Sequence, residues 1–585
     1  MATVLILNDK QLFPDSGQSI KLTRENPYFT QSDSYTLDVS LPMDILENRA
    51  FFRNIQRIEA SKRTQPMTCR LVVDNRVLLA GSARVTQVTE NVVKVQLLGG
   101  NSEVNFLSND NGDYIDEMPL GKVLKDNTKT GTDKFYVSSG IRLALSPVND
   151  ETYSEWTNHF HFCLIDIVRE VLKCYGFMID SCDLDTEPWN RVFVATAKQT
   201  AEVAHTLPHW KPKQLIDEFC KFFNVVLVTD QVTKKASFVS AHSFFTQARR
   251  QVVVPVDEYS SEISEESDAH ALAADSLAFD MSGSPCHDYD AIPDDVRDAA
   301  PRQTFTSKSE AVAAYEQLSA QERLRRIFDC PAGSFAGWQH DYTDVGQEEP
   351  ETLFTQIDMF GPLLRESSGE TRLKICPVAI GLQEYTSQFG QGEAASILKY
   401  IMTVPSLENP TGNDMGVQIT SSGNWFAGSR SSQADETATI QELVEGDESV
   451  EKAEKEDRLQ VMFVDDVLQT IFTERSGKKA QVKEYTIGFT DFNYKPSHVA
   501  GETHRKWSFS LKPTDADYYL GQLHKNGFSF NMKAKLCVKF LAENIPNPKD
   551  VFVIRNKQYG CEKIEANITE SGCDHLITSY LYEML

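Results

Sequence analysis

Apolar and polar residues alternate with a period of two across much of the first 125 residues. This pattern is typical of strands that bury one face and expose the other. The alternating segments are residues 35–41, 70–73, 77–88 and 92–97. Asp74-Asn75 and Glu90-Asn91 separate neighbouring segments, and Gly81 interrupts the segment 77–88. Short strands divided in this way favour an antiparallel barrel or sandwich. Residues 48–58 fit one short helix that follows Pro42.

A helical period replaces the alternation between residues 150 and 255. One helix is predicted to end at the C-terminal cap Gly176, and its apolar face consists of Leu164, Ile167, Val168, Val171, Leu172 and Tyr175. A second begins near Pro212, a residue suited to the first helical turn, and its apolar face consists of Leu215, Ile216, Phe219, Phe222 and Phe223. Residues 225–228 and 236–239 follow as a hairpin, which predicts an α+β domain.

The second half of the chain changes character several times. Residues 256–350 combine an acidic stretch broken by Ser, Gly and Pro with an amphipathic helix at 308–328, and we interpret them as a linker and helix. Residues 351–405 form a mixed β region, and residues 406–457 an acidic loop that we expect to be mobile. Strand patterns return over 458–585, at residues 460–464, 483–489, 507–511, 534–540, 551–554 and 561–568. The predicted fold is therefore multi-domain, β-rich α+β: β-barrel or sandwich domains at 1–125 and 458–585, with the helix–hairpin domain inserted at 150–255.

Charge and cysteine content narrow the class of protein. The chain carries 84 acidic against 58 Lys and Arg residues, a net charge of −26, whereas a sequence-independent nucleic-acid binder needs a basic footprint. The 11 cysteines include no CxxC pair, which predicts free thiols in a reducing compartment. Neither a secretory signal nor a run of about 18 apolar residues is present, so we expect no membrane span. The sequence predicts a protein assembled in the cytoplasm.

The best candidate for metal binding is His159-Phe-His161-Phe-Cys163. Alternate residues of a strand share one face, so three ligands could converge on zinc. The competing interpretation is a helix that begins near Phe162 and points these side chains apart. Cys573-Asp-His575 with Cys561 is a weaker candidate of the same kind. Neither set offers a fourth ligand, and we predict no metal, no cofactor and no catalytic residues.

The remaining motifs favour turns, loops or solvated charge. Asn109-Asp-Asn-Gly112-Asp113 has Gly112 too early for a calcium loop. Gly390-Gln-Gly392 lacks the context of a phosphate loop. Asp465 and Asp466 are adjacent, so they face opposite sides of a strand. Asn567-Ile-Thr569 is a chance glycosylation sequon.

Four segments together resemble the tail-tip or baseplate hub proteins of tailed phages, in particular large tail proteins of phages and prophages of Bacteroides-type bacteria. They are residues 35–49, 94–106, 207–226 and 551–583. The resemblance implies two tube-like β-barrel domains with α+β domains between them, and a trimeric ring below the tail tube. It leaves residues 257–350 and 406–457 uncovered.

The resemblance further implies a virion protein that contacts other tail proteins: the tube, the distal tail and receptor-binding proteins. It carries no catalytic signature, so we expect a structural subunit and no enzyme. Two alternatives stay open: a hydrolase that acts at the cell surface, and a host-binding adhesin module.

Overall fold

The computed structural model describes most of the chain, with gaps. The described residues are 3–30, 32–59, 66–102, 113–126, 134–149, 156–196, 200–230, 232–246, 250–256, 258–263, 277–279, 302–306, 308–319, 322, 327–330, 333–343, 352–359, 371–377, 380–387, 396–403, 417–419, 425–427, 458–472, 481–489, 493–494, 507–511, 513–514, 516–525 and 530–585. No helix among them is long and apolar enough to cross a membrane.

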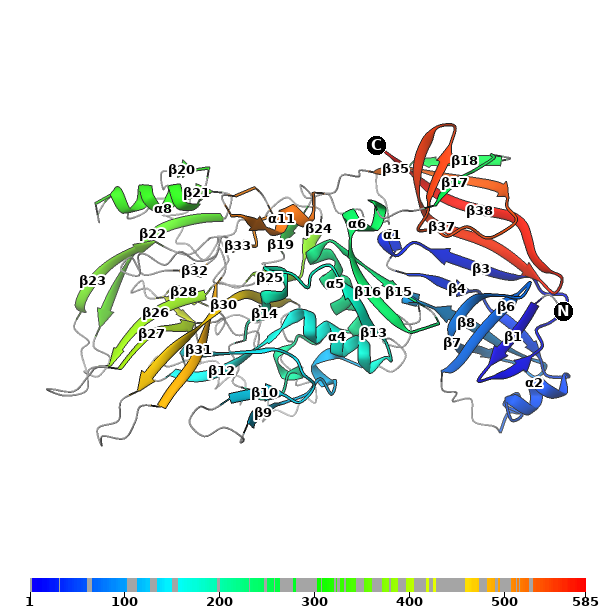
Figure 1. Cartoon of the computed structure of the whole chain (residues 1–585), viewed down its shortest axis with the longest axis horizontal. Helices are drawn as coiled ribbons and strands as arrows, with labels where there is room; N and C mark the ends of the chain where they lie inside the picture. Colours follow the sequence, from blue (N-terminus) through cyan, green and yellow to red (C-terminus); the bar gives the residue numbers. More distant parts are fainter. Residues whose placement is uncertain are drawn as a thin grey trace, which may run out of the picture.

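The two ends of the chain build one 14-stranded sheet, which we call the terminal β body. Its strands are β1 (Thr3–Leu7), β2 (Lys10–Leu12), β3 (Ile20–Glu25), β4 (Ser34–Thr36), β5 (Val39–Pro42), β6 (Met67–Val73), β7 (Arg76–Val88), β8 (Val92–Gly99), β17 (Gln251–Val253), β18 (Glu258–Ile263), β35 (Phe530–Leu541), β36 (Val551–Ile554), β37 (Lys557–Thr569) and β38 (Gly572–Met584). The main path runs β18-β35-β38-β37-β3-β4-β8-β7-β6-β1-β2. Figure 1 shows both chain ends in this body, which forms one end of the elongated molecule.

The antiparallel pair β3–β37 joins the two ends of the chain, with Ile20 opposite Ile568 and Glu25 opposite Lys563. Two hydrophobic clusters lie along the sheet, one under β1–β8 and the other under β35–β38. Ile568 comes from the C-terminal strand β37 but is fully buried in the cluster of the N-terminal strands. The N-terminal core is therefore complete only when the last strands of the chain are in place.

The central body combines a nine-stranded and a three-stranded sheet with two helices. The larger sheet contains β11 (Leu143–Asn149), β12 (Trp156–Cys163), β14 (Val192–Val194), β25 (Ile375–Pro377), β26 (Ile380–Ser387), β27 (Ser396–Thr403), β30 (Leu459–Phe472), β31 (Gln481–Phe489) and β32 (Asn493–Tyr494). The smaller sheet contains β13 (Met178–Cys182), β15 (Val225–Thr229) and β16 (Lys235–Ser240). The helices α4 (Leu164–Cys174) and α5 (Pro212–Phe223) pack between them.

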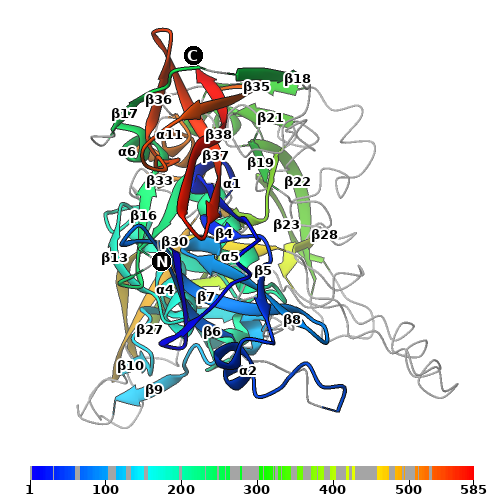
Figure 2. The ribbon, with the colours of Figure 1, turned by 90° about the vertical axis from the view of Figure 1, so that its right-hand side faces the viewer.

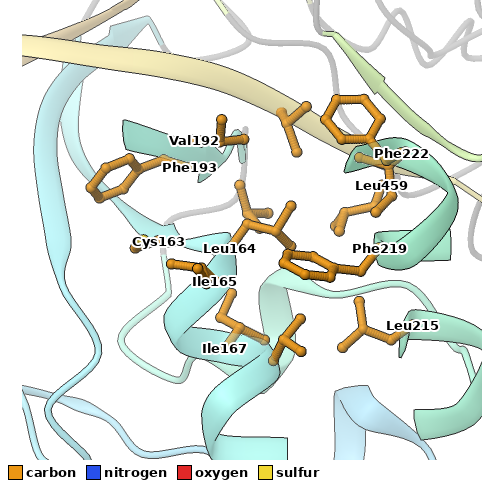
Figure 3. Close-up of a cluster of buried hydrophobic side chains, with 14 of the residues drawn as sticks. Cys163, Leu164, Ile165, Ile167, Val192, Phe193, Leu215, Phe219, Phe222 and Leu459 are labelled. Carbon is orange, nitrogen blue, oxygen red and sulfur yellow. The ribbon is translucent and has the colours of Figure 1, made fainter. Parts of the chain in front are cut away.

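Both helices form where the sequence predicts them. Gly176 has φ +81° just beyond α4, and Asn224 ends α5 in the left-handed region with φ 50°. Leu164 and Ile167 of α4 contact the same buried cluster as Phe219 and Phe222 of α5. Figure 3 shows Val192 of β14 and Leu459 of β30 completing this cluster. A fully buried side chain of this size contributes roughly 1.5–3 kcal/mol through burial.

The remaining elements are short or lie at the periphery. The helices are α1 (Pro27–Thr30), α2 (Leu46–Phe51), α6 (Ala241–Thr246), α8 (Lys308–Gln317) and α11 (Leu520–Leu523), with 3-10 turns η1 (Ile115–Glu117), η2 (Trp189–Arg191) and η3 (Ala204–Thr206). The strands are β9 (Val123–Asp126), β10 (Lys134–Val137), β19 (Leu277–Phe279), β20 (Arg302–Thr304), β21 (Ile327–Cys330), β22 (Gly333–Thr343), β23 (Thr352–Met359), β24 (Thr371–Leu373), β28 (Val417–Ile419), β29 (Trp425–Ala427), β33 (Trp507–Ser508) and β34 (Tyr518–Tyr519).

An aromatic cluster fixes the terminal β body to the central body. Tyr28 of α1 lies edge-on to Phe245 of α6 with ring centroids 4.7 Å apart, and Phe530 of β35 lies 5.2 Å from Phe245. Beside them, Asn101 donates a hydrogen bond to the carbonyl oxygen of Leu227 at 2.7 Å. Buried aromatic pairs of this geometry favour one fixed arrangement.

The β-rich α+β class with large antiparallel sheets is confirmed, but several details differ from the sequence predictions. Strands β30–β32, predicted as part of the C-terminal β domain 458–585, belong to the larger sheet of the central body. The described strands form no closed barrel, since their path ends at the separate edges β18 and β2. The linker predicted at 256–350 has to be corrected at residues 258–263, which form β18 of the large sheet. The helix predicted at 308–328 ends at Gln317, and Ile327–Cys330 is a strand. Most of the acidic segment 406–457 lies outside the described residues.

Candidate functional site

The strongest metal candidate from the sequence lies on one continuous strand. β12 runs through to Cys163, and α4 begins only at Leu164, so His159, His161 and Cys163 keep the alternation of a strand. All three side chains are buried. The helix of the competing interpretation does follow, but it begins at Leu164, two residues later than expected. The structure brings the three side chains to one face of the strand.

Burial keeps these three groups uncharged. It lowers the pKa of His159 to about 4 and, with a further contribution from His159, that of His161 to about 3. His161 Nδ1 accepts a hydrogen bond from the Thr196 N–H at 3.3 Å. Burial raises the pKa of the Cys163 thiol to about 12, although zinc binds the thiolate. No group of three or more His, Cys, Asp or Glu side chains in the described part of the chain is placed to hold a metal ion.

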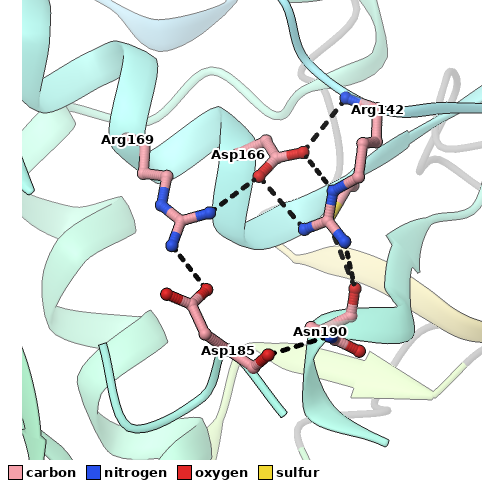
Figure 4. A network of polar contacts seen from close by, with 6 residues as sticks. Arg142, Asp166, Arg169, Asp185 and Asn190 are labelled. Carbon is pink, nitrogen blue, oxygen red and sulfur yellow. Dashed lines mark hydrogen bonds and ion pairs between the residues drawn. The ribbon is translucent and has the colours of Figure 1, made fainter. Parts of the chain in front are cut away.

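Cys163 belongs instead to a polar network around α4, which Figure 4 shows. Arg142 donates to Cys163 Sγ at 3.0 Å and to Asp166 through Nε at 2.7 Å and Nη2 at 3.1 Å. Arg169 joins Asp166 to Asp185. Burial alone would raise the pKa of Asp166, but the hydrogen bonds from Arg142 bring it below its ordinary value. The network connects the first turn of α4 to the segments on either side of it.

The same network extends to the loop before β14. Arg142 Nη1 donates to the carbonyl oxygen of Asn190 at 3.0 Å, and Asn190 Nδ2 donates to that of Asp185 at 3.0 Å. Two arginines that neutralise two aspartates and satisfy a backbone carbonyl form a structural clamp. The sequence pattern could not identify this clamp, because its members lie up to 48 residues apart.

The second metal candidate is not assembled. Cys561 lies opposite Leu581, whereas Cys573 lies opposite Ile568 at the other end of the β37–β38 hairpin. At about 3.3 Å per residue, this separation puts the two thiols roughly 20 Å apart. His575 Nδ1 lies 3.2 Å from the carbonyl oxygen of Ala542. These residues have roles in the hairpin and form no common site.

The other motifs are only partly covered by the structure. Asn109–Gly112 and Gly390–Gly392 lie outside the described residues, while Asp113 accepts a hydrogen bond from the Tyr175 hydroxyl at 3.1 Å. Asp465 and Asp466 lie on β30, and nothing of their side chains is described. Asn567 is an exposed residue of β37.

A cavity of about 510 Å³ lies near the β2 edge of the terminal β body. Its acidic lining residues are Asp15, Asp44, Glu47 and Glu570, and no Lys or Arg lines it. No sequence motif predicts this cavity. Because the loop after β2, the start of α2 and the β37–β38 turn form it together, only the tertiary structure reveals it.

Comparison with known proteins gives little support for an assignment. No model of a known protein family matches the chain, and no curated protein matches it. Two solved structures align along nearly its whole length. The 43 kDa tail protein of prophage MuSo2 from Shewanella oneidensis has 10% identity and a TM-score of 0.32, covering 99% of this chain and 96% of its own. The tail protein from Neisseria meningitidis MC58 has 6% identity and a TM-score of 0.32, covering 100% and 96%. Likenesses this weak carry no argument about fold or function.

Proposed function

We propose that the chain is a structural subunit of a phage tail, located in the distal hub or tail tip. There it closes the tail tube and docks receptor-binding or cell-puncturing proteins. The proposal rests on the sequence resemblance of residues 35–49, 94–106, 207–226 and 551–583. The resemblance implies tube-like domains from both ends of the chain with an α+β domain between them.

The pairing of β3 with β37 is the observation that best supports the proposal. Residues 35–49 and 94–102 lie in the N-terminal part of the terminal β body, and segment 551–583 lies in its C-terminal part. Residues 207–226 lie in the central body, where they supply α5 and the start of β15. The segments from the two ends of the chain thus lie side by side in one sheet, and segment 207–226 lies in the other body.

We further propose that the chain has no catalytic activity and acts through assembly, as a homotrimer in contact with other tail proteins of the virion. The buried histidines and the Arg142 clamp are accounted for by packing and local polar contacts. The hydrolase and adhesin alternatives gain no support from a specific residue described above.

Electron microscopy of the intact virion tests the assignment most directly. We expect density for this subunit at the distal end of the tail tube, repeated about the tail axis. Density along the tube wall, in the head or only at the fibre tips would overturn the hub assignment. Absence of the protein from purified virions would overturn the tail assignment itself.

Charge gives a second test. A three-fold ring carries 3 × −26 = −78 formal charges, and we propose that residues 1–125 and 458–585 line a channel that is neutral to negative. Lys and Arg along such a channel would hold DNA phosphates through counterion release. The purified protein at micromolar concentration should therefore show no salt-sensitive binding to duplex DNA. Binding that weakens steeply as salt rises would contradict this channel.

A further inference from the structure

The two edges of the 14-stranded sheet differ in how they are protected. β2 is three residues long, contains Lys10 and is followed closely by Pro14. Short length, lysine and proline are the usual devices that prevent an edge strand from pairing with another chain. β18 has six residues, contains neither lysine nor proline, and exposes every residue. Within the described structure it pairs only with β35, so its outer backbone edge is open.

The apolar face of the sheet continues onto β18. Tyr259 lies opposite Val538, which is fully buried in the C-terminal cluster, and Ile263 lies opposite Ala534. Directly opposed residues of antiparallel strands share a face, so Tyr259 and Ile263 extend the face that the cluster covers. Yet Tyr259 is 66% exposed and Ile263 is 84% exposed. Figure 2 shows β18 at the margin of the body, far from α2 at its other end.

We propose that β18 pairs antiparallel with β18 of a second copy of this chain, about a two-fold axis at Ser261. The inference goes beyond the proposed function and does not rest on it. A two-fold axis perpendicular to the sheet passes between a residue and the same residue of the second copy, which lie directly opposite each other. Because β18 has six residues, an axis at Ser260 or at Ser261 leaves the largest number of residues paired between the two copies. The two registers differ in which side chains they bring together.

The charges of β18 favour one of these two registers. An axis at Ser260 puts Glu258 opposite the partner's Glu262, and directly opposed like charges are destabilising. An axis at Ser261 puts Tyr259 opposite the partner's Ile263 and Ser260 opposite the partner's Glu262. Tyr259 of each copy then covers Ile263 of the other, so that two such apolar contacts form, one on each side of the axis. In this register the strand is complementary to itself, which identifies a second copy as the occupant.

The particle mass tests the contact. One chain has a mass of 65.9 kDa, and light scattering of the purified full chain should give twice that value or an even multiple. Ile263→Glu should halve the mass, because it puts a carboxylate against the partner's Tyr259 in place of the apolar contact. Val232→Glu is the matched control, since Val232 is 72% exposed in the β15–β16 turn, and should leave the mass unchanged. A monomer would overturn the inference. A trimer whose mass Ile263→Glu does not change would also overturn it, although such a trimer would still agree with the proposed tail ring.

Disulfide trapping tests the register. Cα atoms of opposed residues lie about 4.5–5.5 Å apart, within the range that a disulfide bridges. Ser261→Cys should therefore give a covalent dimer under mild oxidation. Ser260→Cys should not, because the two copies of residue 260 are then diagonal neighbours about 7–8 Å apart. Both variants are made with Cys537→Ser, since Cys537 lies opposite Ser260 in the same chain. Trapping through residue 260 alone, or through neither residue, would overturn the proposed axis.

Discussion

The helices and the β15–β16 hairpin of the central body come from one stretch, residues 164–240, and the later strands β25–β27 and β30–β32 extend its larger sheet. The terminal β body, by contrast, assembles its strands from both ends of the chain. In the central body, amphipathic helices pack aromatic side chains against strands. In the terminal β body, backbone ladders such as β3–β37 bring distant segments together. We therefore expect the stability of the central body to depend most on the volume of its buried side chains, and that of the terminal β body on the long-range pairing of β3 with β37.

The largest effect should follow removal of an aromatic ring from the central core. Phe219 is fully buried and contacts Phe223 and Phe238 with ring centroids 5.0 Å away in each case. Phe219→Ala should lower the free energy of unfolding by about 3–5 kcal/mol, measured by urea titration. Met178→Ala is the control, because Met178 is 70% exposed in the same body, and its effect should stay below about 0.5 kcal/mol. Similar losses for the two variants would contradict the assigned core.

Ile568→Ala tests the pairing of the two chain ends. Ile568 is fully buried among side chains of β1–β8, so the cavity should cost about 2–5 kcal/mol. The loss should be accompanied by faster hydrogen exchange of amides in β3, its partner strand. Asn567→Ala is the matched control, since Asn567 is the exposed neighbour on the same strand. If hydrogen exchange of the β3 amides is the same in Ile568→Ala as in the unmodified protein, the N-terminal core does not depend on the C-terminal strand.

The buried histidines of β12 should make the central body sensitive to acid. Both have a folded pKa below the ordinary value of 6.5, about 4 for His159 and about 3 for His161. As pH falls below 6.5, the unfolded chain takes up these protons first. The stability from the neutral histidines is thus complete above pH 6.5 and is lost progressively toward pH 3.

His161→Leu measures this contribution. Between pH 6 and 4 its free energy of unfolding should fall less steeply than that of the unmodified protein, by about 1.4 kcal/mol per pH unit. Between pH 7.5 and 8.5 the difference between the two proteins should be constant. Parallel curves from pH 4 to 8.5 would show that His161 is not the buried neutral group described.

The smallest effect should come from the clamp around α4. Arg142 is partly exposed, so solvent screens its pair with Asp166, and we expect a coupling energy of about 1 kcal/mol. A double-mutant cycle of Arg142→Gln and Asp166→Asn measures it directly. Lys235 with Asp180 is the comparison pair, more than half exposed on both sides, and its cycle should give less. Equal coupling energies in the two cycles would show that the Arg142–Asp166 pair is no stronger than an exposed ion pair.

Sequence periodicity predicted α4, α5 and the β15–β16 hairpin well because each of these elements is local. The spacing of Leu164, Ile167 and Val171 already marks the buried face of α4, and Gly176 marks its end. Nothing comparable marks β18. Its residues are exposed on both faces, and its partner strand β35 lies about 270 residues later, so an acidic polar stretch was indistinguishable from a linker.

The candidate site was predictable only in part. The alternation of His159, His161 and Cys163 indicated a shared face, but the sequence could not show that β12 continues through Cys163 before α4 begins. The role of Cys163 depends on Arg142, which lies 21 residues away, and on the fold between them. The sequence left a barrel and a sandwich both open, because alternation reveals single strands and not whether the outermost two meet.

The β3–β37 ladder also sets the order of events during synthesis. β3 emerges from the ribosome early, but Ile568, the residue opposite Ile20, follows 568 − 20 = 548 residues later. At roughly 5–20 residues per second, that strand edge waits about 30–110 s for its partner. Throughout this interval the nascent chain carries an open edge above an unfinished apolar core, where a chaperone can bind and where two neighbouring nascent chains can pair wrongly. Slowing translation lengthens the exposure of the N-terminal strands, and supplying the C-terminal segment as a separate polypeptide shortens it.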